Sequence, residues 1–132
     1  MRLNRFLTAA GVAIVAGCGS GMSSSPSSNS TSPSQVTIQD FSFKPATLTV
    51  KAGTTVTWIN SGPSAHTVTS DTMVFQSANL SGPTAGDAYG GGGMAGASFQ
   101  FTFNTPGTYA YHCSLHPPSS YPGFTGTIAV TQ

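Results

Sequence analysis

Toward its C-terminus the 132-residue chain reads Tyr111-His112-Cys113-Ser114-Leu115-His116-Pro117. A thiolate at the end of a strand and an imidazole three residues later can both reach one ion across a tight turn. A further histidine, His66, lies far upstream in Ala65-His66-Thr67 and must approach from a neighbouring loop. Two imidazole nitrogens and one cysteine thiolate are the ligand types of a blue-copper centre. The sequence therefore predicts one copper ion bound by His66, Cys113 and His116.

The rest of the chain predicts an all-β fold. β-branched and aromatic residues alternate with polar ones in short runs separated by Gly, Pro, Asn and Ser, which is typical of strands. The expected strands include residues 36–38, 41–43, 48–50, 56–59, 67–69, 99–103, 108–112 and 127–130. About seven or eight strands in under roughly a hundred residues indicate a two-sheet Greek-key sandwich. An immunoglobulin-like sandwich would normally have an inter-sheet cysteine pair, which this segment lacks.

Two longer segments carry a resemblance to a known family. Residues 44–58, KPATLTVKAGTTVTW, resemble the N-terminal half of a cupredoxin, a small copper protein of the plastocyanin and amicyanin type. Residues 105–113, TPGTYAYHC, resemble the penultimate strand of that family, and the run from Tyr111 to Pro117 its copper-binding end. The resemblance implies a monomeric electron carrier with redox proteins as partners. It implies neither an enzyme nor a small-molecule substrate.

The predicted site departs from the family at the axial position. A methionine usually follows the second histidine within a few residues, but the loop here is longer. Aligning residues 126–128 with the closing strand of the family places Phe124 at the methionine position. Phenylalanine cannot coordinate, so the copper is expected to be three-coordinate or nearly so, with a raised reduction potential. Tyr121, Met94 and Met73 remain alternative axial ligands.

Two further residues near the ligands have expected roles. In the family, the residue after the first histidine ties the two ligand loops together, and Thr67 stands there. Its hydroxyl is expected to bond the backbone at Cys113 and Ser114, although an ordinary strand residue would also fit. His112 is expected to point to the opposite strand face from Cys113 and not to bind the same ion. Because the chain has only three histidines, it cannot build a second, catalytic copper cluster by itself.

The N-terminal segment indicates export and lipid attachment. Residues 1–17 contain two arginines and an apolar stretch with the size of a signal-peptide core, too short to span a bilayer. Residues 15–18, VAGC, resemble a bacterial lipobox in which Cys18 becomes the lipidated first residue. Residues 18–34, rich in Ser, Gly and Pro, are expected to form a flexible linker. Residues 35–132 are then expected to form one copper-binding domain. A disulfide between Cys18 and Cys113 is the disfavoured alternative.

Charge excludes one class of partner. Beyond the signal segment, the charged residues are Lys44, Lys51, Asp40, Asp71 and Asp87, and the chain has no glutamate. This near-neutral balance excludes a basic nucleic-acid surface. It also predicts weak long-range steering of charged partners.

A glycine-rich insertion separates two of the expected strands. Residues 81–97 are far longer than the corresponding family loop and contain four consecutive glycines, which are costly to order. They are expected to form a flexible surface loop and not a rigid catalytic element. A docking role or a lid over the copper stays open.

Together these features predict a lipid-anchored cupredoxin on the periplasmic or extracellular side of the cell envelope. It would carry single electrons between redox proteins outside the cytoplasmic membrane. His116 is expected near the surface, within an apolar patch formed with Pro117, Pro118 and Phe124. The alternatives are copper storage, delivery or resistance, and an empty β-sandwich used for adhesion. The chain lacks the Met-rich or His-rich clusters typical of copper capture, which favours electron transfer.

Overall fold

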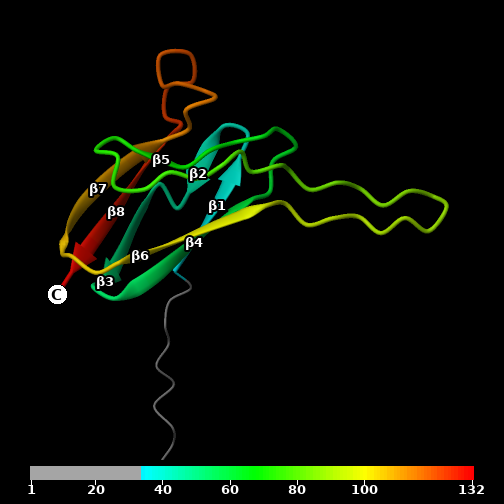
Figure 1. Ribbon diagram of the computed structural model, residues 1–132. Coiled ribbons are helices and arrows are strands. Elements are labelled where there is room, and N and C mark those ends of the chain that lie inside the picture. The colour runs from blue at the N-terminus through cyan, green and yellow to red at the C-terminus, as the bar shows by residue number, and fades with distance from the viewer. Residues whose placement is uncertain (1–33) are drawn as a thin grey trace, which may run out of the picture. The chain divides into compact units, whose positions relative to one another are not determined.

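The computed structural model describes residues 34–132 (Figure 1). The predicted signal, Cys18 and nearly all of the linker lie outside the described residues. The described chain forms two four-stranded sheets. The strands are β1 (Gln35–Gln39), β2 (Ser42–Lys44), β3 (Thr47–Lys51), β4 (Thr54–Asn60), β5 (Thr69–Ser70), β6 (Ser98–Phe103), β7 (Gly107–His112) and β8 (Thr125–Thr131). Residues 34–132 contain no helix long and apolar enough to cross a membrane.

The two sheets are assembled from strands that are mostly distant in sequence. One sheet has the order β2-β1-β4-β6 and the other β3-β8-β7-β5. β1 runs parallel to β4, and β3 runs parallel to β8, whereas the other pairs are antiparallel. Between β2 and β7 every connection crosses from one sheet to the other, so only β1–β2 and β7–β8 pair with their sequence neighbours. The predicted all-β sandwich of two sheets is confirmed.

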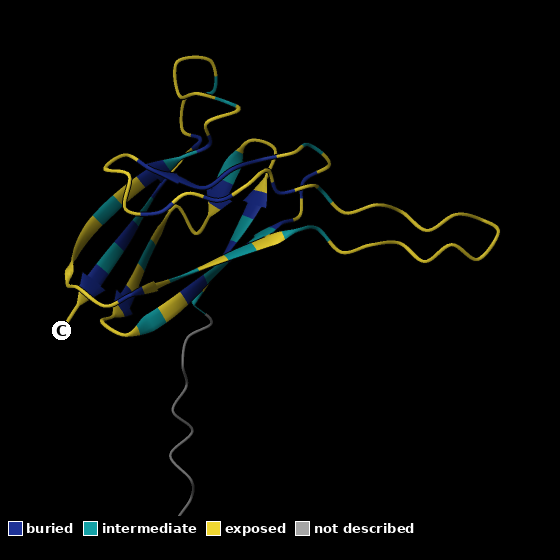
Figure 2. Cartoon of the chain, viewed as in Figure 1, coloured by how far each residue is buried: buried dark blue, intermediate teal, exposed yellow. Residues whose placement is uncertain are grey.

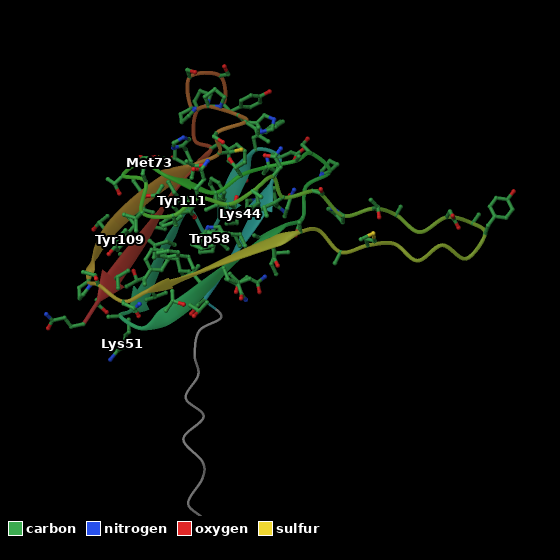
Figure 3. All side chains as sticks on the ribbon, in the orientation of Figure 1. Lys44, Lys51, Trp58, Met73, Tyr109 and Tyr111 are labelled. Carbon is green, nitrogen blue, oxygen red and sulfur yellow. The ribbon has the colours of Figure 1, made fainter. Side chains whose placement is uncertain are left out.

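The core lies between the sheets, and strands such as β4 and β8 bury every second side chain there (Figure 2). In β4 the inward positions are Val56, Trp58 and Asn60, and all three are fully buried. Trp58 meets Tyr111 of β7 edge to face, with ring centroids 5.6 Å apart. Figure 3 shows both rings within the sandwich, whereas Lys51 points away from it. Burial raises the pKa of Tyr111 to about 12, so its phenol stays neutral there.

The glycine-rich insertion is more regular than the predicted loop. It projects from the body between β5 and β6 as a long arm (Figure 1). The backbones of Thr84 and Met94 exchange two hydrogen bonds, with N–O distances of 3.0 and 3.1 Å. At the tip, Asp87 Oδ1 accepts hydrogen bonds from the backbone of Tyr89 and Gly91. A polar side chain and backbone pairing therefore organise the turn of the arm.

Gly126 in β8 is required by its neighbour across the sheet. It lies opposite Tyr111 in the β7–β8 register, and a Cβ atom added to it would overlap the Tyr111 ring. Because the ring is packed against Trp58, it cannot yield without disturbing the core.

Gly126→Ala is expected to lower the free energy of unfolding by about 1–3 kcal/mol, the usual cost of overpacking a core. Urea denaturation of the two proteins measures the change. Gly92→Ala is the matched control, because a Cβ there meets nothing within 4 Å. Equal stability of the Gly126 and Gly92 variants would contradict the described packing of Tyr111.

Candidate metal centre

Three donor atoms converge at the loops that follow β4 and β7. Cys113 comes directly after β7, and His116 lies in the loop beyond it. His66 lies in the segment between β4 and β5, where its backbone exchanges two hydrogen bonds with Leu80, of 3.0 and 2.8 Å. One ligand atom from each of His66, Cys113 and His116 lies within 4.8 Å of the other two. The structure therefore brings together the three residues that the sequence predicts.

Both imidazoles present the same ring nitrogen to the sulfur. Cys113 Sγ lies 3.8 Å from His66 Nδ1 and 3.5 Å from His116 Nδ1, and the two Nδ1 atoms are 3.2 Å apart. His66 and Cys113 are fully buried. Thiolate and imidazole are ligands that suit copper, and this donor group contains no carboxylate. The residues present therefore fit a single copper ion.

The sulfur of Cys113 is held from the opposite loop by Thr67. The Thr67 backbone N–H donates to Cys113 Sγ at 3.3 Å, and the Thr67 hydroxyl lies 3.8 Å from the same atom. The Ser114 backbone N–H donates to Thr67 Oγ1 at 2.8 Å. A hydrogen bond to sulfur stabilises the thiolate over the thiol. Thr67, at the position expected from the sequence, thus contacts both Cys113 and Ser114.

A carboxylate outside the predicted set holds His66. Asp40 Oδ1 lies 2.6 Å from His66 Nε2, and Ser64 Oγ donates to Asp40 Oδ2. Partial desolvation acts to raise the pKa of Asp40, but hydrogen bonds from Ser64 and His66 outweigh it, so the pKa lies below its usual value. Asp40 lies in the turn between β1 and β2, 26 residues before His66. No motif in the sequence points to Asp40. The one feature that could have drawn attention to it is that the chain has only three acidic residues.

His116 is the donor closest to solvent. Its ring is partly exposed and lies 4.9 Å from the Phe41 ring. Phe41 and Leu115 expose 39% and 45% of their surface, and Pro117 and Pro118 are also exposed. The predicted apolar patch is thus present, but Phe41 is a member that the sequence did not indicate.

The predicted place of Phe124 in that surface patch is wrong. Phe124 is fully buried, with its ring 4.7 Å from Phe43 and 5.0 Å from His66 between centroids. Both the aromatic core and the donor group pack against this ring, which leaves it no solvent-facing side. Phe124 is therefore an internal apolar wall of the site.

The other axial candidates differ in their surroundings. Tyr121 is partly buried, and its ring centroid lies 4.9 Å from that of His116 and 4.4 Å from that of Phe41. Met73 and Met94 expose 72% and 71% of their surface. Met94 belongs to the projecting arm, and Met73 lies in the turn after β5. Tyr121 is the candidate that packs beside the site.

His112 lies outside the donor group, as expected from strand alternation. Its Nδ1 is 2.6 Å from Asp71 Oδ1 on the partly exposed face of β7. Cys113 is a free, buried cysteine. The sulfur is therefore available for a metal, beside His66 and His116.

Comparisons with known proteins identify the family of this site. The family described as copper binding proteins, plastocyanin/azurin family, matches residues 31–131. A plastocyanin from Scenedesmus fuscus is 36% identical over 89 residues, which cover 67% of this chain and 85% of that protein. Amicyanin from Paracoccus denitrificans is 35% identical over 82 residues, covering 62% of this chain and 56% of the amicyanin. This chain thus spans little more than half the length of that amicyanin.

Solved structures agree with the fold. A purple cupredoxin from Nitrosopumilus maritimus has a TM-score of 0.55 at 25% identity, covering 74% of this chain and 98% of that one. A Cu-containing nitrite reductase from Thermus scotoductus SA-01 has a TM-score of 0.58 at 25% identity, covering 76% of this chain but 22% of that one. The similarity to the reductase is thus limited to a part of that enzyme.

The comparisons also bear on the predicted chemistry. They confirm copper as the cofactor and place the chain with plastocyanin and amicyanin, which are not enzymes. Because the family match includes both sheets and all three donors, the chain belongs to the plastocyanin/azurin family of copper-binding proteins.

Proposed function

We propose that this protein carries single electrons through one type 1 copper ion bound by His66, Cys113 and His116. The main support is the convergence of one sulfur and two Nδ1 atoms within 4.8 Å, in a chain of a copper-binding family. Copper bound there supplies a one-electron couple between Cu(II) and Cu(I). The role of the protein is to keep the three donor atoms in nearly the same positions in both oxidation states.

The contacts around the donors suit that task. His66 is held at its backbone by Leu80 and at its ring by Asp40. Cys113 Sγ accepts the Thr67 backbone N–H, and the His116 backbone N–H donates to the Cys113 carbonyl at 3.3 Å. None of these contacts requires a metal ion, so the chain itself holds the three donors close together. A preformed donor arrangement keeps the reorganisation on electron transfer small.

The surface around His116 supplies a route to a redox partner. An electron leaving through the partly exposed ring would cross the apolar patch of Phe41, Leu115, Pro117 and Pro118. A small contact at this patch would bind a partner protein weakly, as fast release between turnovers requires.

Copper storage, delivery or resistance is the alternative function. Within residues 34–132, however, His66, Cys113 and His116 form the one group of at least three His, Cys or acidic residues able to hold a metal ion.

The proposed location is the cell envelope, outside the cytoplasmic membrane. The support is the lipobox-like VAGC at residues 15–18 and the Ser, Gly and Pro-rich residues that follow. Lipidated Cys18 would anchor the chain, and the linker would let the copper domain reach partners near the membrane.

The copper assignment predicts that Cys113→Ser loses the intense visible band that a thiolate-to-copper transition produces. Absorption and EPR spectra of the purified protein with added Cu(II) and a mild oxidant measure this. His112→Ala is the matched control and is expected to keep the band, because His112 pairs with Asp71 outside the donor group. A weak, ordinary Cu(II) spectrum from the unmodified protein would favour the delivery or adhesion alternatives.

The axial assignment predicts that Phe124→Met lowers the reduction potential, because a thioether ligand stabilises Cu(II). The expected decrease is at least about 59 mV, a tenfold change in a one-electron equilibrium. Redox titration followed at the visible band measures it, and Phe124→Leu controls for the loss of the ring. Equal potentials in the Met and Leu variants would remove Phe124 from the axial position.

The anchor assignment predicts that the protein is found with membranes and that Cys18→Ala is not retained there. Fractionation of an expressing bacterium, with mass spectrometry of the N-terminal peptide, measures attachment and the lipid itself. Unmodified Cys18 in a soluble mature protein would refute the anchor and leave the copper proposal intact.

A further inference from the structure

The carboxylate of Asp40 contacts the side of His66 that faces away from the other donors. Asp40 Oδ1 lies 2.6 Å from Nε2, whereas Nδ1 of the same ring faces Cys113 Sγ and His116 Nδ1. The imidazole is fully buried, so water does not compete for Nε2. An ionised carboxylate only accepts hydrogen bonds, so Nε2 must carry the hydrogen. In a neutral ring, Nδ1 is then left with the lone pair that a metal requires.

The loop after β4 holds this carboxylate by a hydrogen bond and by close packing. Ser64 Oγ donates to Asp40 Oδ2, and a Cβ added to Gly62 would overlap Asp40 Oδ1. The loop is itself shaped by buried Asn60. Its Nδ2 donates to the Ser64 carbonyl at 2.7 Å, and its Oδ1 accepts the Gly62 N–H at 3.0 Å. Asp40 is therefore held on two sides, with its charge directed at His66.

The charge of Asp40 lies beside a donor of the proposed copper site. Asp40 is one of only three acidic residues in the chain. Within the described residues, its ion-pair contact is with His66 and not with a lysine. A negative charge beside a ligand ring stabilises a more positive metal centre over a less positive one. Asp40 itself is solvent-exposed, but the His66 ring through which it acts is fully buried. Asp40 therefore favours Cu(II) over Cu(I).

We propose that Asp40 is a positioning residue of the copper centre, which holds His66 with Nε2 protonated and lowers the reduction potential. This inference rests on the proposed role of His66 as a copper ligand. The residue acts through His66 and does not touch the copper itself. It also offsets the preference for Cu(I) that a non-coordinating Phe124 would create.

The first test compares Asp40→Asn with Asp71→Asn in redox titrations. The two substitutions remove the same charge from carboxylates that lie 2.6 Å from a histidine nitrogen, but His112 is not a predicted ligand. Asp40→Asn is expected to shift the equilibrium at least tenfold toward Cu(I), which is about 59 mV for one electron. Asp71→Asn is expected to produce a much smaller shift. Equal shifts in the two variants would overturn the proposal.

The second test needs no copper. Nitrogen-15 NMR of the metal-free protein, at a pH where His66 is neutral, reports which ring nitrogen carries the hydrogen. The Nε2–H form is expected in the unmodified protein, and a mixture with the Nδ1–H form in Asp40→Ala. A predominant Nδ1–H form in the unmodified protein would overturn the proposal. This result is independent of whether the protein proves to be an electron carrier.

Ser64→Ala provides a variant that leaves Asp40 and His66 in place. It removes one hydrogen bond to the carboxylate, so Asp40 is held less firmly while its charge is retained. The expected shift is smaller than that of Asp40→Asn, because the carboxylate keeps its charge beside His66. A shift as large as that of Asp40→Asn would contradict the proposal that the charge of Asp40 sets the potential. If the unmodified protein lacks a type 1 spectrum, the proposed function fails, and the NMR result still decides the contact between Asp40 and His66.

Discussion

The geometry of the metal centre depends on the hydrogen bonds that join Thr67 to Cys113 and Ser114. Through them, the loop after β4, in one sheet, is tied to the end of β7, in the other. His66 directly precedes Thr67, and His116 follows Ser114 by two residues. The link therefore sets the positions of two histidines that are 50 residues apart in sequence. A displacement of the C-terminal end of β4 or of β7 would separate the donors.

Beneath the donors, the aromatic core continues into the site. Tyr111 packs between Trp58 and Phe43, and Phe43 in turn packs against Phe124, the wall beside His66. The apolar side of the centre is thus a direct continuation of the packed core. On the other side, the turn between β1 and β2 contributes polar Asp40 and aromatic Phe41 as neighbours. The centre thus has an apolar boundary that favours the lower metal charge and one carboxylate that favours the higher.

The three donors were predictable because Cys-x-x-His places two of them on one turn and leaves a single upstream histidine that is not adjacent to the cysteine. Period-two alternation likewise located the strands, as in β4 with Val56 and Trp58 inward. The contribution of the β1–β2 turn was not predictable, because β1 joins β4 in parallel and that pairing has no local signal. For the same reason the patch was predicted with Phe124 instead of Phe41. The order of residues showed that Phe124 lies near the ligand loop. It did not show whether the ring faces the core or the solvent.

The unequal burial of the donors also bears on how the metal is gained and lost. His66 and Cys113 have no solvent-accessible surface, whereas His116 has some. A copper ion entering from solvent would therefore approach from the His116 side, because the sulfur and the other imidazole are closed to water. The exposure of this one imidazole, and not that of the sulfur, would then govern how readily the site is filled and emptied.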